Sequence, residues 1–301
     1  MTIELSSLAP PDVVETIDFE AILASRKAAL LALIPDDQRA AVEAALALES
    51  DPLTKLLEEN AYREITLRQR VNDAARSVML AYASDADLDQ IGGNFGVARL
   101  VIDAGDPTAI PPVAATLESD DDYRRRILLS LESYTTAGSE ASYRYHALSA
   151  SGLVADAKAV SPAPGQVTVY VLSRTGNGAA DDQLLQAVAA ALNVAEVRPM
   201  TDQVTVLSAG IVEYTIEAAL IISSGPDSDV VRASALAAAA AYAAEQHRLD
   251  ADISLSGIYR ALHQPGVDRV DLTAPAGNIA VAVGQAPYCT DILLTTGEVG
   301  G

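Results

Sequence analysis

The chain lacks several features that large classes of proteins require. It has a single cysteine, Cys289, so no disulfide can form within the chain and nothing in the sequence requires an oxidising compartment. The first 25 residues contain no lysine or arginine, unlike a secretory signal peptide. The most apolar long segment, residues 233–244, is far shorter than the roughly 18 residues that span a bilayer. We therefore expect a protein that folds in a reducing cytoplasm and does not insert into membranes.

Positive charge is also scarce. The chain has 20 Lys and Arg residues against 41 Asp and Glu residues, for a net charge of −21. This imbalance argues against a nucleic-acid partner, because binding phosphates requires clustered basic side chains. The only local basic cluster, residues 124–126, directly follows the aspartates at 120–122, and we expect the two groups to balance each other on a helix. Most basic residues are arginines, which are favoured over lysine at ordered protein interfaces.

The sequence contains no established catalytic or phosphate-binding motif. A nucleophile elbow, a phosphate-binding loop with GK[ST] and an HExxH helix are all missing. The glycine-containing segment 174–178 is not followed by the lysine that a phosphate loop needs, so it predicts a tight turn. We expect no catalytic residues and no cofactor, although a pair of acids that meet in the folded chain stays open as a hydrolase alternative.

Metal ligands are equally poorly supported. Asp85, Asp87 and Asp89 match the first ligand positions of a calcium-binding EF-hand loop, but Gln90 and Gly96 stand where glycine and glutamate are needed. Acidic residues at the start of a helix explain the run better. The three histidines, at positions 146, 247 and 263, do not have helical metal-ligand spacing. We therefore expect no metal site.

A long helix is the strongest structural signal. Asp51 can cap it, Pro52 suits its first position, and no further proline or glycine occurs before Gly92. This predicts a helix over residues 52–83, about 30 residues and roughly 45 Å long. Its apolar residues recur at helical spacing, at Leu53, Leu57, Ala61, Ile65, Leu67, Val71, Ala74, Val78 and Tyr82.

The opposite face of this predicted helix is charged. Glu59 with Arg63, and Glu64 with Arg68, are spaced four residues apart in the favourable order. Such pairs contribute only a few tenths of a kcal/mol each, so packing must supply most of the stability of the helix. Two partners are possible: the core of a larger domain of the same chain, or a helical bundle shared with other chains.

Several long segments resemble a known family. These are RQRVNDAARSVMLAYA at 68–83, DLDQI at 87–91, FGVAR at 95–99, ESDDDYRRRI at 118–127, SYRYHALSASGLVADAKAVSPAPGQVTVYVLSRTGNG at 142–178 and VRPMTDQVTV at 197–206. In this order they resemble the baseplate J-like proteins, wedge components of contractile phage tails and related injection machines. The resemblance covers roughly residues 50–285. The chain departs from the usual pattern at Asp85, where the family usually has glycine, and at Gly92, where it usually has alanine.

The resemblance implies a structural, non-enzymatic role in a virion or particle tail baseplate assembled in the bacterial host cytoplasm. Two copies of the chain would join a smaller I-like tail protein through a helical bundle to form a wedge. Six wedges would close a ring around the spike, near the sheath, and open when the sheath contracts. Whether the particle is a phage, a headless tailocin or another injection device stays open. The rival classes are a soluble adaptor and an acid-dyad hydrolase.

The chain is expected to have an α+β fold, with a helical region followed by two small α/β units. The predicted parts are an extended N-terminal arm (1–16), a helical bundle region (17–99), a linker or hinge (100–117), helices with the first α/β unit (118–210), and a C-terminal α/β unit at the inter-wedge contact (211–301). The proline-rich segment 100–117 could equally be an insertion. A sheet shared by both units is possible, and the strand order stays open.

The expected elements follow from periodicity and capping residues. Helices are predicted at 18–34, 36–49, 52–83, 85–92, 119–133, 139–152, 180–193, 227–247 and 255–263. Strands are predicted at 153–160, 166–173, 203–207, 211–222, 267–273 and 278–283.

The resemblance also suggests which residues face the shared bundle. The interface candidates on the long helix are Leu56, Tyr62, Leu67, Arg70, Asn72, Asp73 and Arg76. Packing within the chain could account for the same residues.

Overall fold

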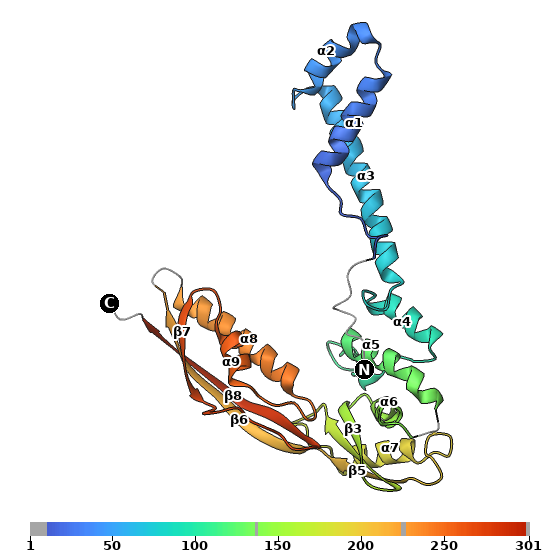
Figure 1. The fold of residues 1–301 in the computed structure, drawn as a ribbon, viewed down its shortest axis with the longest axis vertical. Helices are drawn as coiled ribbons and strands as arrows, with labels where there is room; N and C mark the ends of the chain where they lie inside the picture. The colour runs from blue at the N-terminus through green and yellow to red at the C-terminus, as the bar shows by residue number, and fades with distance from the viewer. Residues whose placement is uncertain (1–10, 136–137, 224–226, 299–301) are drawn as a thin grey trace. The chain divides into compact units, whose positions relative to one another are not determined.

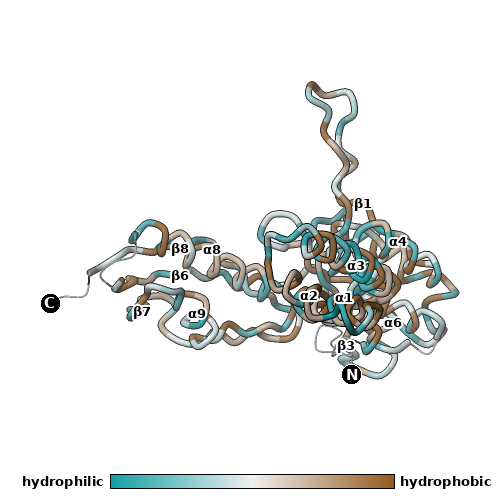
Figure 2. Tube along the Cα trace, turned by 90° about the horizontal axis from the view of Figure 1, so that it is seen from above, coloured by the Kyte–Doolittle hydropathy of each residue, from teal (hydrophilic) through white to brown (hydrophobic). Residues whose placement is uncertain are grey.

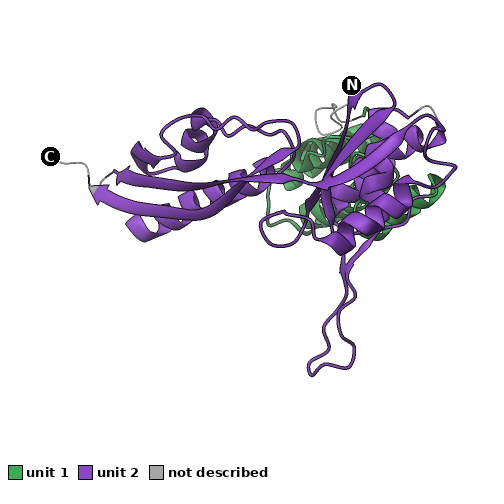
Figure 3. Ribbon diagram, turned by 90° about the horizontal axis from the view of Figure 1, so that it is seen from below, with its two compact units in different colours: residues 1–96 green, residues 97–301 purple. Residues whose placement is uncertain are grey.

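The computed structural model describes residues 11–135, 138–223 and 227–298, and the chain divides into two compact units (Figure 3). Unit 1 comprises residues 1–96, and its regular elements among the described residues are all helices, whereas unit 2, residues 97–301, carries the β-sheets. Helices followed by sheet-and-helix layers confirm the predicted α+β class. Residues 1–10 of the predicted N-terminal arm lie outside the described residues.

Unit 1 is built around one long helix. Its elements are α1 (Phe19–Leu33), α2 (Asp36–Leu46), α3 (Pro52–Ser77) and α4 (Asp85–Asn94). Helix α1 lies alongside α3, and α2 contacts both (Figure 1). The predicted start of α3 is confirmed, because the Asp51 carboxylate accepts a 2.8 Å hydrogen bond from the Leu53 amide and Pro52 opens the helix.

The prediction that this helix continues to residue 83 is wrong. Helix α3 ends at Ser77, and the Val78 backbone has left the helical conformation. The Met79 amide bonds to the Arg76 carbonyl at 3.0 Å, a three-residue turn typical of a tightened helix end. No glycine or proline marks this stop in the sequence, so local residue preferences could not reveal it.

The described part of the predicted N-terminal arm is tied to α3. The Asn72 side-chain amide donates to the Glu15 carbonyl at 2.9 Å, and its oxygen accepts from the Glu15 amide at 3.0 Å. The Glu15 carboxylate also forms a 2.8 Å ion pair with Arg68. Residues near Glu15 are therefore ordered by their own chain.

Unit 2 begins with a protruding β-hairpin. Strands β1 (Val101–Asp103) and β2 (Thr116–Leu117) pair antiparallel, and Figures 2 and 3 show the loop between them standing clear of the neighbouring elements of unit 2. This is the segment 100–117 that the sequence suggested as a linker. Its two ends are bonded to each other, since the Glu118 amide donates to the Leu100 carbonyl at 2.9 Å. The hinge assignment stays a prediction, while the structure divides into units between Gly96 and Val97.

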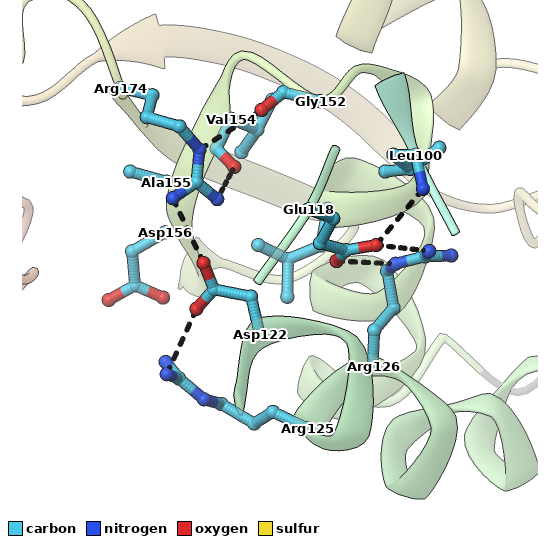
Figure 4. A pocket seen from close by; sticks show the side chains of 11 residues that line it. Leu100, Glu118, Asp122, Arg125, Arg126, Gly152, Val154, Ala155, Asp156 and Arg174 are labelled. Atoms are coloured by element: carbon cyan, nitrogen blue, oxygen red, sulfur yellow. Dashed lines mark hydrogen bonds and ion pairs between the residues drawn. The ribbon is translucent and has the colours of Figure 1, made fainter. Parts of the chain in front are cut away.

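A buried ion pair closes the base of this hairpin. Two guanidinium nitrogens of Arg126 bond to the two carboxylate oxygens of Glu118 at 3.0 and 2.6 Å (Figure 4). Both side chains are almost completely buried, and the Glu118 carboxylate also accepts from the Leu100 amide at 3.2 Å. Arg126 donates further to the Ala98 carbonyl at 2.6 Å. These bonds compensate for burying the two charges.

Two capped helices follow the hairpin. They are α5 (Asp120–Leu129) and α6 (Glu140–Ala150), with a short 3-10 helix, η2 (Ser130–Tyr134), after the first. The predicted caps are confirmed: Ser119 Oγ accepts from the Asp122 amide at 3.2 Å, and Ser139 Oγ from the Ser142 amide at 3.1 Å.

The expected charge balance on α5 is only partly confirmed. Arg124 pairs with Asp121 and Arg125 with Asp122, both three residues apart. Arg126 instead pairs with Glu118, outside the helix. The prediction treated the three arginines as equivalent, but Arg126 lies on the buried face.

The first sheet contains three strands with two helices over one face. Strand β4 (Gln166–Ser173) lies between antiparallel β3 (Val154–Ala163) and parallel β5 (Gln203–Ser208), with α7 (Asp182–Leu192) connecting β4 to β5. Helices α6 and α7 cover the sheet. The core side chains include Tyr143, Ala147, Val167, Val169, Val171, Leu184, Val188 and Leu192.

The second sheet repeats this pattern with a different chain order. Its central strand, β6 (Gly210–Ile222), lies between antiparallel β7 (Val267–Ala274) and parallel β8 (Gln285–Glu298). Helices α8 (Ser228–Gln246) and α9 (Leu255–Leu262) cover one face (Figure 1). The core includes Ile216, Leu220, Ala235, Ala239, Ile258 and Leu262. The two sheets are separate, so the suggested shared sheet is not formed.

The last predicted strand is misplaced. Residues 278–283 form no strand, although Ile279 bridges to Ile253, and the final strand is β8. Strand β8 contains Pro287 and several polar residues, which weaken its sequence signal. It is stabilised by pairing with β6 along its length and lies at the sheet edge, where proline is tolerated.

Polar contacts fix the junction between the two sheets. Asp156 Oδ2 accepts from the Leu249 amide at 3.2 Å, and Lys158 pairs with Asp250. Gly284 has a positive φ of 78°, and a Cβ there would lie 2.5 Å from the Tyr170 ring, so only glycine fits. The two sheet units of unit 2 are therefore joined by specific contacts.

We expect Arg126→Ala to lower the free energy of unfolding by about 3–5 kcal/mol, because it leaves the Glu118 carboxylate buried without its partner. Arg125→Ala is the matched control, since Arg125 is next to Arg126 but about half exposed. It should cost no more than about 1 kcal/mol. Urea unfolding followed by circular dichroism measures both, and equal losses would contradict the proposed importance of the buried pair.

Candidate assembly interface

Helix α3 carries two apolar stripes on different faces. The first packs against α1 and α2 within unit 1. Its apolar residues are the fully buried Ala61 and the half-buried Leu57 and Ile65, and the polar residues Thr54 and Asn72 are buried on the same face. This stripe accounts for the helix packing that the chain can supply by itself.

The second stripe of α3 is exposed. It comprises Leu56, Leu67 and Val71, whose side chains are 60%, 67% and 60% exposed. The spacings of 11 and 4 residues are close to whole helical turns, so the three residues share one face. Polar and charged residues occupy this face between Leu56 and Leu67, and Val78, 73% exposed, follows directly after the end of the helix. Exposed apolar side chains that gather between polar residues are typical of a protein interaction surface.

Charged contacts hold α1 against α3 beside these stripes. Glu64 accepts from Arg26 on α1 and forms a 2.8 Å ion pair with Arg68 on α3. Hydrogen bonds from Arg26 and then Arg68 hold the pKa of the Glu64 carboxyl below its usual range. The predicted pair of Glu59 and Arg63 is also formed. Of these contacts, the pair of Arg26 and Glu64 joins α1 to α3, and the other two lie within α3.

An open groove of about 430 Å³ runs between α1 and α3. On α1 it is lined by Ala21, Ser25 and Ala29, one small residue per turn. Arg26 and Arg68 lie at its rim among other polar residues. Small side chains at this spacing allow another helix to approach closely.

The seven predicted interface residues lie in different surroundings. Leu56 and Leu67 belong to the exposed stripe, and Arg70 and Arg76 are also exposed. Tyr62 is largely exposed, and its ring centroid lies 5.1 Å from that of Phe19 on α1.

The remaining two candidates make contacts within unit 1. Asp73 accepts a 2.8 Å hydrogen bond from Gln69. Asn72 is only 3% exposed and binds the Glu15 backbone, so it acts inside unit 1. The interface role of the seven residues stays a prediction.

The change of face along α3 can be seen in the sequence. Its apolar series steps by only two residues from Ile65 to Leu67. Two residues correspond to about 200° around a helix, so this step marks a change of face. Leu67 and Val71, which follow the step, are the exposed residues that it indicates.

Two acids, Glu118 and Asp122, line one small charged cavity of unit 2, and the hydrolase alternative can be examined there. Asp122 pairs with Arg125 and with Arg174 at 2.9 Å, while Glu118 pairs with Arg126 (Figure 4). The cavity that they line holds about 20 Å³, room for one water-sized molecule. Both carboxylates already bond to arginines, and the cavity has no room for a substrate larger than water. These ion pairs link the hairpin base, helix α5 and the end of strand β4.

Burial shifts the pKa values of three other titratable side chains so that their neutral forms are favoured. Burial lowers the pKa of His146 and raises the pKa of the Cys289 thiol. Burial and a 2.8 Å hydrogen bond to Asp202 raise the pKa of Tyr143. Over the described residues, no group of three or more His, Cys, Asp or Glu side chains could hold a metal ion.

The structure also bears on membrane insertion. Within the described parts of the chain, none of the helices combines the length and apolar character needed to cross a bilayer.

The sequence matches known proteins over nearly its whole length. Models of the baseplate J-like N-terminal domain, central domain and C-terminal domain match residues 49–106, 135–208 and 214–295. These segments contain α3 with α4, the first sheet, and most of the second sheet. The chain is 53% identical to baseplate protein J of Escherichia phage P2 over 295 residues, 98% of each protein. The chain belongs to the baseplate J-like family.

Proposed function

We propose that this chain is a structural wedge subunit of a contractile tail baseplate. The observation that carries the proposal is the exposed apolar stripe of α3, which the packing of unit 1 leaves uncovered. The family membership and the likeness to a phage baseplate protein support the same role. In this role the chain is located in the tail baseplate of the particle, is assembled in the host cytoplasm, and needs no catalytic site.

The wedge would contain two copies of this chain and one smaller I-like tail protein. The exposed stripe of α3 and the small-residue groove beside α1 offer two faces for helices of other chains. Two such faces support a bundle of more than two helices, as the resemblance implies. The long helix would then belong to a helical bundle shared with other chains. This is one of the two alternatives that its sequence allowed, the other being the core of a larger domain of the same chain.

The second sheet unit would contact neighbouring wedges. Strand β8 lies at the edge of its sheet, and Leu293 on it is about half exposed. Exposed edge strands offer backbone groups and side chains to another chain. Six wedges would close the ring around the spike, and the ring would open as the sheath contracts. The particle could equally be a headless tailocin or another injection device.

Co-expression of this chain with the small I-like tail protein should yield a complex of two copies with one partner, because each copy presents an exposed stripe. Native mass spectrometry measures the stoichiometry directly. A lone monomer over a wide range of concentrations would overturn the wedge assignment.

Leu67→Glu combined with Val71→Glu should abolish that complex, because it places two charges in the centre of the stripe. Both positions are exposed, so the melting temperature of the isolated chain should stay close to that of the wild type. Leu131→Glu is the control, a substitution at a comparably exposed apolar residue of unit 2. Complex formation by the double variant would show that the stripe is not the interface.

Arg70→Glu combined with Arg76→Glu tests the charged candidates beside the stripe. Reversing both charges should block wedge assembly and leave the isolated chain folded, because both side chains are exposed. Size-exclusion chromatography with circular dichroism separates the two effects. Unchanged assembly would remove these residues from the interface.

A further inference from the structure

The hairpin of residues 100–117 presents an apolar tip that unit 2 does not cover. We define the tip as residues 110–113, Ile-Pro-Pro-Val. Ile110 is 99% exposed and Val113 more than half exposed. Figures 2 and 3 show the hairpin projecting away from the body of unit 2. Fully exposed large apolar side chains at the end of a projecting element are typical of an anchor that inserts into a partner.

The tip is held in one shape by its own hydrogen bonds. Asp106 and Val113 exchange two backbone bonds of 2.9 Å, which close the loop. The Asp106 carboxylate accepts from the Thr108 amide at 2.8 Å and from its hydroxyl at 2.6 Å. Gly105 has a φ of 66°, and a Cβ there would lie 2.4 Å from the Val113 carbonyl oxygen. A preformed loop loses little conformational entropy when it binds.

The base of the hairpin is equally well fixed. Glu118 links both ends, since its backbone and carboxylate bond to Leu100 while its carbonyl accepts from Arg99 at 2.8 Å. The buried pair with Arg126 holds Glu118 in place. A rigid base and a rigid tip place Ile110 at a defined position relative to unit 2.

The charge of the hairpin indicates which kind of surface it fits. Residues 100–117 include Asp103 and Asp106 but no lysine or arginine. The whole chain carries a net charge of −21, so a second copy would present a predominantly acidic surface to an acidic hairpin. A complementary surface has an apolar pocket with a basic rim. The tip also lies between the matched family segments, which end at residue 106 and resume at residue 135.

We propose that the tip inserts into an apolar pocket with a basic rim on a different protein of the particle. The inference rests on the proposed function in one respect, because the partner is a component of the same baseplate. The Ile110 side chain fills the pocket, the two prolines keep the tip rigid, and Asp103 and Asp106 approach the basic rim.

Photo-crosslinking in assembled tails tests the proposal. Benzoylphenylalanine replaces Ile110 of the full chain, tails are assembled and irradiated, and the crosslinked peptides are identified by mass spectrometry. The expected product joins position 110 to a tail protein of different sequence, at a segment close to lysine or arginine. The same probe replacing Leu131, another exposed apolar residue of unit 2, is the control for random contacts.

Charge variants give a matched second measurement. Ile110→Asp should lower incorporation of the chain into tails about tenfold or more, as expected for loss of a central anchor. Ala114 is exposed on the hairpin, so Ala114→Lys and Ala114→Glu differ only in the sign of the added charge. The lysine variant should lower the crosslink yield, and the glutamate variant should maintain or raise it.

The outcomes separate this inference from the proposed function. If tails contain the chain but position 110 crosslinks no better than position 131, the inference is overturned and the proposed function stands. A crosslink to a second copy of the chain also overturns it. If the wild-type chain is not found in tails at all, the proposed function fails, and the inference fails with it.

Discussion

The helical unit of residues 1–96 has more apolar surface than its own helices can cover. Helix α3 buries one stripe against α1 and α2, and the stripe containing Leu67 and Val71 stays exposed. A single long helix with two short ones over part of its length cannot enclose it on all sides. The described helices of unit 1 leave this surface open, and the proposed assembly rests on it.

Unit 2, in contrast, has extensive and specific internal contacts. Each sheet has a central strand with one parallel and one antiparallel neighbour, and two helices close one face. The salt bridge of Lys158 with Asp250 and the close fit of Gly284 against Tyr170 connect the two sheets. The buried pair of Glu118 and Arg126 holds the base of the hairpin against helix α5. These contacts make the described part of unit 2 one packed body.

Local chemistry explains which elements could be predicted. Three helices begin at Pro52, Asp120 and Glu140. A capping side chain within three residues marks each of these starts, so the sequence alone reveals them. The end of α3 has no such marker. Strand β8 depends on hydrogen bonds to β6, more than 60 residues earlier in the chain, and no local pattern reports them. Two of the candidate interface residues, Asn72 and Tyr62, contact residues of unit 1 that lie far away in the sequence.

The sequence by itself determined the family, the α+β class, most helix and strand positions, and the presence of an amphipathic helix with too many apolar residues for one face. It could do so because caps, periodicity and long shared segments are local properties of the chain. Only the tertiary structure decided which stripe of α3 is covered, that residues 100–117 form a hairpin with hydrogen-bonded ends, and that Arg126 pairs with Glu118. These features depend on packing between distant segments. Burial determines which partner each of several chemically similar side chains takes.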